Sequence, residues 1–340
     1  MTDSTPETTA PPADETRAAA KAAASARAAR LSTLPLEQIG PRGGFFAGPI
    51  HALRDLFDHR ELLDLLIRRE IKARYKDSAL GLIWTLAKPL TQLLIYYLVL
   101  GQFLGAARSI QSFAVYIFAG LTAYGLFSEI VIMATSSIVV SAGLVKKVYL
   151  PREIFPVASF GSALFNFSIQ LGILVIASLL TGQLVPGLHL LYLPVAIAIV
   201  VVYALALGIA LAAVNVYARD MQYLIEIVVM LLMWFSPIVY SWTFVVKEAS
   251  AWGMPWLADL YLHTPLTLAV LGFQAAFWWP GSVATVASLN RQDFPPDFGF
   301  TNFPPGLGTS MLVCLLIGVV LLWLAQRLFA RLEGNFAQEL

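Results

Sequence analysis

The residues of this 340-residue chain that could carry chemistry are aromatic and hydroxyl-bearing side chains set in long apolar stretches. Sugar rings stack on aromatic faces and sugar hydroxyl groups bond to tyrosine oxygens, so a path lined by such residues would suit a glycan. The alternative is ordinary helix packing with aromatic belts at the membrane surface, and it is favoured for any single residue. The residues concerned are Tyr96, Tyr97, Tyr116, Tyr124, Phe127, Tyr203, Trp234 and Tyr240.

Sequence signatures of catalysis are absent. There is no Gly-x-x-x-x-Gly-Lys-Ser/Thr loop to hold a nucleotide, no His-Glu-x-x-His zinc motif and no nucleophile elbow. The single cysteine, Cys314, excludes a disulfide framework, and the four histidines are too far apart in sequence to indicate a ligand cluster. We therefore expect a chain that is not an enzyme and holds no metal and no cofactor. The 22 basic and 21 acidic residues nearly balance, which gives no indication of nucleic-acid binding.

The elements that must position the aromatic residues are membrane helices. Apolar residues make up 58% of the chain and charged residues only 13%, and so large an apolar excess has to face lipid. We predict an all-α integral membrane protein whose transmembrane domain, residues 84–330, has six helices, because six apolar runs are long enough to cross about 30 Å of hydrocarbon. The runs are Trp84–Gly105, Ser112–Met133, Ile154–Leu180, Leu190–Val214, Gln222–Ser241 and Thr309–Ala330.

The insert between the fifth and sixth runs, residues 242–308, is predicted to lie on the outer face. Thr264–Trp279 is apolar but short, so we expect one or two short re-entrant or interfacial helices over Trp252–Trp279. All but three of the 22 Lys and Arg residues then fall on the inner side, which predicts cytoplasmic N- and C-termini. The three on the outer side are Arg108, Lys247 and Arg291.

The chain before the first run has two parts. Residues 1–33 lack large apolar side chains and are expected to be disordered, and residues 34–83 are expected to form a cytosolic or interfacial amphipathic region. Aliphatic residues from Leu63 to Ile71 recur there at helical spacing beside a strongly basic set, which predicts a helix lying among membrane lipid head groups. A solvated helix packed on a neighbouring domain is the alternative. A short cytosolic tail, residues 331–340, ends the chain.

Three further features could serve transport. Pro237, next to Ser236 in the fifth run, would kink a helix and could act as a gate. Glu129 in the second run is expected to pair with a nearby cation rather than to relay protons. The inward loop Ser141–Pro156 alternates aliphatic and basic residues, which suits insertion into a groove of a soluble partner, and an ordinary basic loop explains it equally well.

Four stretches together resemble the membrane subunits of type-2 ABC exporters, in the branch that exports lipid-linked polysaccharides of the O-antigen type and teichoic acids. RREIKARYKDSALGLIWTLAKPL (68–90) resembles the family's interfacial helix turning into the first span, and LVKKVYLPREIFP (144–156) resembles its coupling helix. NVYARDMQYLIEIVVMLLMWFSPIVY (215–240) and GNFAQEL (334–340) resemble its fourth-to-fifth span segment and its cytosolic tail.

The resemblance implies a homodimer of six-span subunits that forms a continuous channel with two copies of a separate ATPase, on which ATP and Mg would bind. It implies that the interfacial helix and the coupling segment contact that ATPase, the latter through Leu144, Lys146, Lys147, Tyr149, Leu150, Arg152 and Glu153. It also implies that aromatic residues line the channel, here Tyr96, Tyr97, Tyr124, Phe127 and Trp234. The Ala-rich, Lys-poor N-terminal tail and the LEGNFAQEL end are typical of an actinobacterial origin, for which a polyprenyl-linked cell-wall galactan is the expected cargo.

These features together predict a permease subunit in the bacterial cytoplasmic membrane that exports a polyprenyl-pyrophosphate-linked polysaccharide. Residues near the inner interface would attract the lipid pyrophosphate by charge-assisted bonds, namely Arg69, Lys72, Arg74, Tyr75, Lys76 and Lys88. A small-molecule exporter of the same fold is the alternative. A membrane glycosyltransferase or phosphatase acting on polyprenyl carriers is a rival of another class, for which the outer acidic residues are too dispersed.

Overall fold

The computed structural model describes residues 21–22, 25–26, 54–76, 83–147, 150–288 and 301–340. Every regular element in these ranges is a helix, which confirms the predicted all-helical class for this part of the chain. The chain divides into two compact units, Met1–Gly40 and Pro41–Leu340, and the helix bundle belongs to the second. The first unit is described only at residues 21–22 and 25–26, which are helical. The disorder predicted for residues 1–33 otherwise falls outside the described residues.

Within the described ranges, four helices are long and apolar enough to cross a membrane, and a fifth crossing results if the bent pair α12–α13 counts as one span. A helix satisfies its own backbone N–H and C=O groups, which lipid cannot do, so such apolar helices are the form a membrane-crossing chain must take. The chain is therefore a multi-pass membrane protein. The four helices are α6 (Phe113–Val140), α8 (Ile154–Leu180), α9 (Tyr192–Tyr217, preceded by a 3₁₀ turn, Leu188–Leu191) and α15 (Leu307–Leu332).

The first and fifth predicted spans are not single α-helices. Helix α4 (Ile83–Tyr96) continues without a break as a π-helical segment, η1 (Tyr97–Phe103). Helix α10 (Met221–Trp234) ends well before Ser241, so the prediction of one kinked helix reaching that residue is wrong. Pro237 gives the reason, because proline lacks the N–H that a continuing helix needs and disfavours helical backbone at the residue before it.

The predicted short helices between the fifth and sixth spans are present, and one of them enters the bundle. Helices α12 and α13 meet at an angle of 68°, and every residue of α13 from Leu266 to Phe277 is buried. The carbonyl of Phe277 accepts a hydrogen bond of 3.0 Å from Ser178 in the last turn of α8. The helices of this segment are α11 (Trp242–Ala251), α12 (Pro255–Leu262), α13 (Pro265–Phe277) and α14 (Trp279–Ser288).

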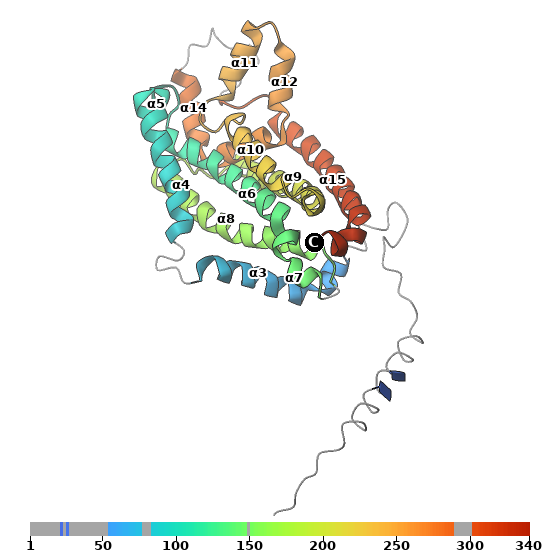
Figure 1. Ribbon diagram of the computed structural model, residues 1–340. Coiled ribbons are helices and arrows are strands. Elements are labelled where there is room, and N and C mark those ends of the chain that lie inside the picture. The colour runs from blue at the N-terminus through green and yellow to red at the C-terminus, as the bar shows by residue number, and fades with distance from the viewer. Residues whose placement is uncertain (1–20, 23–24, 27–53, 77–82, 148–149, 289–300) are drawn as a thin grey trace, which may run out of the picture. The chain divides into compact units, whose positions relative to one another are not determined.

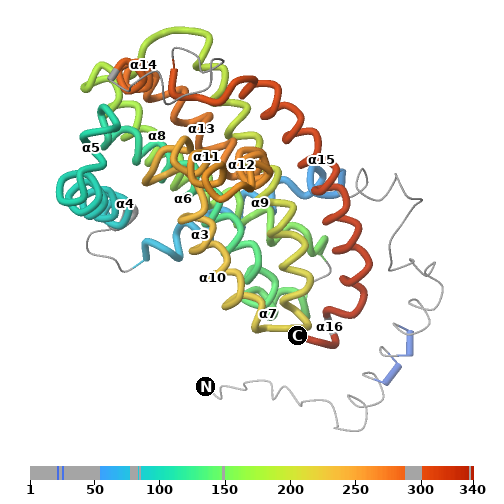
Figure 2. Tube along the Cα trace, turned by 90° about the horizontal axis from the view of Figure 1, so that it is seen from above, coloured from blue at the N-terminus to red at the C-terminus, as the bar shows by residue number. Residues whose placement is uncertain are grey.

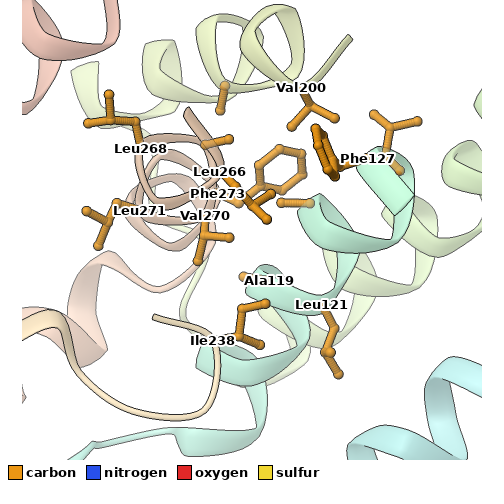
Figure 3. Close-up of a cluster of buried hydrophobic side chains, with 14 of the residues drawn as sticks. Ala119, Leu121, Phe127, Val200, Ile238, Leu266, Leu268, Val270, Leu271 and Phe273 are labelled. Atoms are coloured by element: carbon orange, nitrogen blue, oxygen red, sulfur yellow. The ribbon is translucent and has the colours of Figure 1, made fainter. Parts of the chain in front are cut away.

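Helix α6 is the centre of the bundle. It packs against α8, α9 and α13, and most of its side chains are buried. Phe127 of α6, Phe273 of α13 and Val200 of α9 meet in the apolar cluster shown in Figure 3. Small residues allow the closest contact between α6 and α9, because a methyl group added to Gly208 would lie 2.7 Å from Cβ of Ala134.

The two ends of the bundle differ (Figure 1). Helices α3 (Arg60–Tyr75), α7 (Ala142–Val145) and α16 (Phe336–Glu339) lie at one end, which we call the α3 end. Helices α11, α12, α14 and α5 (Ala106–Ser109) lie at the other, the α11 end. Figures 1 and 2 both place α4 and α15 on opposite edges of the bundle. Helix α4 is therefore a peripheral helix whose outer side faces lipid or another protein.

Replacing Gly318 by alanine should destabilise the bundle. The added methyl group would lie 2.6 Å from the ring of Tyr203, whose hydroxyl donates a 3.0 Å bond to the carbonyl of Cys314 and holds the ring in place. We expect a loss of about 1–3 kcal/mol, measured as a lower unfolding temperature in detergent. Gly172→Ala is the matched control, because a methyl group there meets no atom within 4 Å. Equal unfolding temperatures for the two variants would contradict this packing.

Candidate functional site

A cavity of about 780 Å³ lies between helices α4, α6 and α10, with the last turn of α3 and the middle of α8 at its border. Helices α4 and α10 each begin towards the α3 end, whereas α6 begins at the α11 end (Figure 1). The lining residues are Arg74, Tyr75, Lys88, Pro89, Gln92, Tyr96, Leu121, Tyr124, Gly125, Ser128, Glu129, Ile132, Met133, Asn166, Gln170, Glu226, Val229, Met230, Met233 and Trp234.

The cavity wall changes character along its length. Because α4 and α10 rise from the α3 end, Lys88 and Glu226 lie nearer that end than Tyr96 and Trp234 do. Arg74, at the end of α3, adds a second cation to the same region. The cavity is therefore charged towards the α3 end and aromatic towards the α11 end.

A polar network at the charged end joins three helices. Nη1 of Arg74 in α3 donates to Oε1 of Glu129 in α6 at 2.5 Å, and the amide of Asn166 in α8 donates to the same carboxylate oxygen. The hydroxyl of Tyr75 donates to Oδ1 of Asn166 at 2.8 Å. The expectation that Glu129 pairs with a nearby cation is confirmed, and its partner is Arg74. A carboxylate in an apolar helix needs such partners, because an isolated charge away from water is costly.

Close packing of α3 on α8 brings Arg74 to the cavity. Ile67 of α3 fits over Gly161 of α8, where an added methyl group would lie 2.7 Å from Cγ1 of Ile67. Beside it, the Ser159 hydroxyl donates a long 3.4 Å bond to Glu70. Burial raises the pKa of the Glu70 carboxyl above its ordinary value, and the bond from Ser159 opposes that rise. Helix α3, which the sequence predicts to be interfacial, therefore lies directly against the bundle.

Contacts between α4, α6 and α10 hold the aromatic part of the wall. The rings of Tyr96 and Trp234 meet edge to face, with centroids 6.2 Å apart and an interplanar angle of 65°. Gln92, one helical turn before Tyr96, donates a 3.1 Å bond to the hydroxyl of Tyr96. The hydroxyl of Tyr124 donates a 3.2 Å bond to the carbonyl of Val229. These contacts fix ring positions, and rigid rings are the surfaces on which sugars stack.

The structure brings half of the predicted pyrophosphate-binding residues to the cavity. Arg74, Tyr75 and Lys88 line it. The other three are exposed on or just after α3 and lie outside the cavity; they are Arg69, Lys72 and Lys76. The role of all six stays a prediction.

Three of the five predicted channel-lining aromatic residues, Tyr96, Tyr124 and Trp234, line the cavity. Tyr97 instead packs half-buried against the apolar core at the start of η1. Phe127 lies in the core between α6, α9 and α13, with 5% of its surface exposed (Figure 3). On α6 the cavity residues recur at helical spacing around Gly125, and Phe127 falls outside that arc.

Two other tyrosines of the apolar stretches serve packing rather than the cavity. Tyr203 bonds to the carbonyl of Cys314, and Tyr116 is fully buried against the segment after α10. The hydroxyl of Tyr116 donates to the carbonyls of Pro237 and Tyr240, at 2.9 Å and 2.7 Å. The packing alternative therefore holds for Tyr116 and Tyr203.

Hydrogen bonds from neighbouring side chains hold the segment containing Ser236 and Pro237 in place after the end of α10. The end of a helix leaves backbone carbonyls without helical partners, and these have to be satisfied inside a membrane protein. The carbonyl of Pro237 accepts bonds from Tyr116 and, at 2.8 Å, from the amide of Gln274 in α13. The hydroxyl of Ser236 donates back to the carbonyl of Leu232 at 2.7 Å. A gating role for Ser236 and Pro237 stays a prediction.

A second apolar cluster at the α3 end joins the predicted coupling segment to three other elements. Val145 and Ile154 from that segment pack with Leu66 of α3, Phe329 of α15 and Phe336 of α16. Phe336 is fully buried, and its ring meets that of Phe329 at 5.5 Å. Helix α3, the predicted coupling segment and the C-terminal helix α16 are therefore parts of one packed unit.

The predicted coupling residues have different environments within this unit. Leu144 and Leu150 pack against the cluster, whereas Lys146 and Lys147 are exposed. The guanidinium of Arg152 lies 5.6 Å from the ring centroid of Phe336. The carboxylate of Glu153 is buried and accepts a 2.5 Å bond from Gln326 of α15. Tyr149 lies outside the described residues.

Several lining residues were not singled out from the sequence. Asn166, Gln92 and Gln170 are amides in apolar helices, and Asn166 completes the charged network. Polar side chains within membrane helices tend to face the protein interior, which is the signal that could have found them.

The chain matches the family model described as "ABC-2 type transporter" over residues 61–278. The chain belongs to the ABC-2 type transporter family. It is also similar to proteins named "O-antigen export system permease protein RfbA". The relative from Myxococcus xanthus is 28% identical over 291 residues, covering 86% of this chain and 100% of the relative. Two relatives from Klebsiella pneumoniae are 23% and 24% identical, covering 69% and 65% of this chain and 91% and 81% of their own lengths.

Membership of the ABC-2 type transporter family makes the chain the membrane subunit of a transporter rather than a catalytic enzyme. The match covers α3 through α13, so α3, the cavity and the buried helix α13 all belong to the family's domain.

Glu153 should make the stability of this transporter subunit depend on pH. Burial raises the pKa of Glu153 from 4.5 to about 7, and the neighbouring carboxylates Glu333 and Asp55 add to the rise. The folded chain therefore binds this proton more tightly than the unfolded chain does. The free energy of unfolding should therefore decrease by at most about 3 kcal/mol as pH rises from about 4.5 to 7. Above pH 7 it should not decrease further through this group.

The measurement is the unfolding temperature of wild type and Glu153→Gln across that pH range. The glutamine keeps the oxygen that accepts from Gln326 and removes only the titration. The difference in unfolding temperature between the two proteins should therefore change with pH. The contributions of all other titratable groups are common to both proteins and cancel in this difference. Parallel curves would show that Glu153 does not titrate in this window.

Proposed function

We propose that the chain is the permease subunit of an ATP-driven polysaccharide exporter. The observation that carries this proposal is the cavity, whose charged end suits an anionic head group and whose aromatic end suits sugar rings. The names of the similar O-antigen export permeases support a polysaccharide as the cargo. The membership of a transporter family supports movement across the membrane rather than chemistry on the glycan.

A second copy of the chain completes the path in this proposal. Exposed apolar residues flank the cavity on both α4 and α10 and leave it incompletely walled within one subunit. Two such surfaces facing each other across a twofold axis would turn two one-sided cavities into one conduit. The exposed residues include Leu94, Ile95 and Leu98 on α4 and the following segment, and Ile227, Met230 and Leu231 on α10.

ATP and Mg bind on a separate ATPase in this proposal, two copies of which join two permease subunits. The sequence contains no nucleotide-binding motif, and the family implies an ABC ATPase partner. The exposed Lys146 and Lys147 stand beside the second apolar cluster and offer contacts for that partner. Movement of the ATPase would reach α3 through the packing of Val145 and Leu66 in this cluster.

The cargo is a glycan on a polyprenyl pyrophosphate carrier. Arg74, Tyr75 and Lys88 would meet the pyrophosphate inside the cavity. Arg69, Lys72 and Lys76, exposed on or beside α3, would attract membrane phosphates and the ATPase instead. A galactan of an actinobacterial cell wall remains the specific cargo we expect.

The membrane is the bacterial cytoplasmic membrane, with the α3 end and both termini in the cytoplasm. Six crossings then result if α4 is counted with η1 and α10 with the turns that follow it. Helices α11 to α14 become an outer segment with α13 re-entrant. The positive-inside distribution of Lys and Arg supports this orientation.

The test is transport in vesicles containing this chain with and without its ATPase. Lipid-linked glycan should move only when the ATPase and ATP are both present, and depletion of the chain should leave lipid-linked glycan inside cells. Export of small molecules without any effect on glycan would replace the polysaccharide with another cargo. Turnover of a polyprenyl substrate by the purified chain alone would refute the permease assignment.

Removing the aromatic wall should slow export without unfolding the protein. Replacing Tyr96 and Trp234 together by leucine removes the ring pair that lines the cavity but keeps apolar side chains at both positions. Each stacked ring contributes about 0.5–1.5 kcal/mol, so we expect about a tenfold or greater fall in glycan export per ATPase complex. Phe103→Leu is the control, because this aromatic residue at the end of η1 is 81% exposed and outside the cavity. An equal effect of both changes would exclude stacking at the cavity.

A further inference from the structure

Arg74 has hydrogen-bonding capacity that its described neighbours do not use. A guanidinium carries five N–H donors in a planar fork. One nitrogen, Nη1, donates to Glu129, while Nη2 faces the thioether sulfur of Met133 at 2.8 Å. A thioether is a weak acceptor, so among the described residues Nη2 has no oxygen acceptor and is available to a ligand in the cavity.

Lys88 is a second cation beside the same cavity. It lines the cavity from α4, and both it and Arg74 act electrostatically on Glu129. Among the described residues Lys88 makes no ion pair. Two cations therefore line one region of the cavity together with two carboxylates, Glu129 and Glu226. Of these, Glu129 is engaged by one nitrogen of Arg74 and by Asn166.

We propose that Arg74 and Lys88 form a binding site for a diphosphate group, and that Glu129 is a built-in opposing charge that keeps this binding weak enough for release. The inference rests on the proposed function, because it takes the diphosphate to be that of the lipid-linked cargo. A transport site must bind its cargo and also let it go, and a fixed negative charge beside two cations lowers the affinity without removing the cations.

The surrounding contacts suit Glu129 to this role. Asn166 donates to its carboxylate, and Tyr75 in turn holds Asn166, so Glu129 is fixed in position. The fixed carboxylate holds Nη1 of Arg74, and Arg74 itself lines the cavity. Glu129 therefore positions Arg74 and offsets its charge at the same time.

The direction in which one substitution changes the diphosphate affinity distinguishes the two roles of Glu129. Glu129→Gln keeps the oxygen that accepts from Arg74 and Asn166 but removes the negative charge. In our proposal the variant binds a diphosphate about tenfold more tightly than wild type, because the site gains one net positive charge. If Glu129 only holds Arg74 in place, the variant binds equally or more weakly.

The experiment is calorimetric titration of the full chain, in nanodiscs of zwitterionic lipid, with inorganic pyrophosphate as the probe. Arg74→Met and Lys88→Met should each weaken binding about tenfold or more. Lys88 is exposed, so its replacement tests the site without disturbing the fold. Lys247→Met, which removes an exposed cation from α11, is the matched control and should leave binding unchanged. Unchanged binding in Arg74→Met and Lys88→Met, or equal or weaker binding in Glu129→Gln, would overturn the proposal.

Two further arms identify the source of the phosphate. Polyprenyl pyrophosphate placed in the nanodisc should compete with the probe, whereas phosphatidylglycerol should not. Competition by phosphatidylglycerol alone would mean that the site holds an ordinary membrane lipid, which overturns the assignment to cargo. The transport assay keeps this inference separate from the proposed function: full glycan export by Arg74→Met refutes the site alone, while absence of export by wild type with its ATPase refutes the exporter.

Discussion

A carboxylate set in an apolar helix must find a cation, and the charged end of this subunit is organised around that requirement. Glu129 lies on α6, the most buried of the four long helices, and its cation comes from α3, which lies across the end of the bundle. The ion pair between Arg74 and Glu129 places the last turn of α3 at the cavity, and Asn166 of α8 donates a hydrogen bond to the same carboxylate. The same contact that neutralises a buried charge therefore builds one end of the cavity.

A second constraint, that backbone groups within a membrane must be satisfied, explains the opposite end. Helix α10 stops before Pro237, and the non-helical segment that follows has carbonyls, those of Pro237 and Tyr240, that lipid cannot satisfy. Tyr116 and Gln274 supply the missing donors, and Gln274 can do so only because α13 is buried inside the bundle. The early end of α10 and the burial of α13 therefore depend on each other. With α10 stopping at Trp234, that ring remains beside Tyr96 at the aromatic end of the cavity.

The sequence predicts which segments are helical and apolar, but it does not say which side of each helix faces what. The long spans α8, α9 and α15 and the pairing of Glu129 follow from apolar run length and from the cost of an unpaired charge. Helix α6 is apolar on all sides, so its hydrophobic pattern does not fix its rotation, and Phe127 and Tyr124 were equally good candidates for the cavity. The end of α10 and the contact of Ile67 with Gly161 depend on partners far away in the sequence, which a single sequence does not reveal.

Helix α3 contributes to both the second apolar cluster and the charged end of the cavity. These two sets of contacts could couple an ATPase to the cavity. Leu66 of α3 packs with Val145 of the coupling segment, while Arg74, two turns further on, lies on the cavity wall. A helix is stiff over this length, since each residue adds only 1.5 Å of hydrogen-bonded rise. A displacement of the coupling segment would therefore be delivered to Arg74 as a movement of the whole helix. The contact that such a movement would strain first is the ion pair with Glu129, because α6 is held in place by packing on several sides.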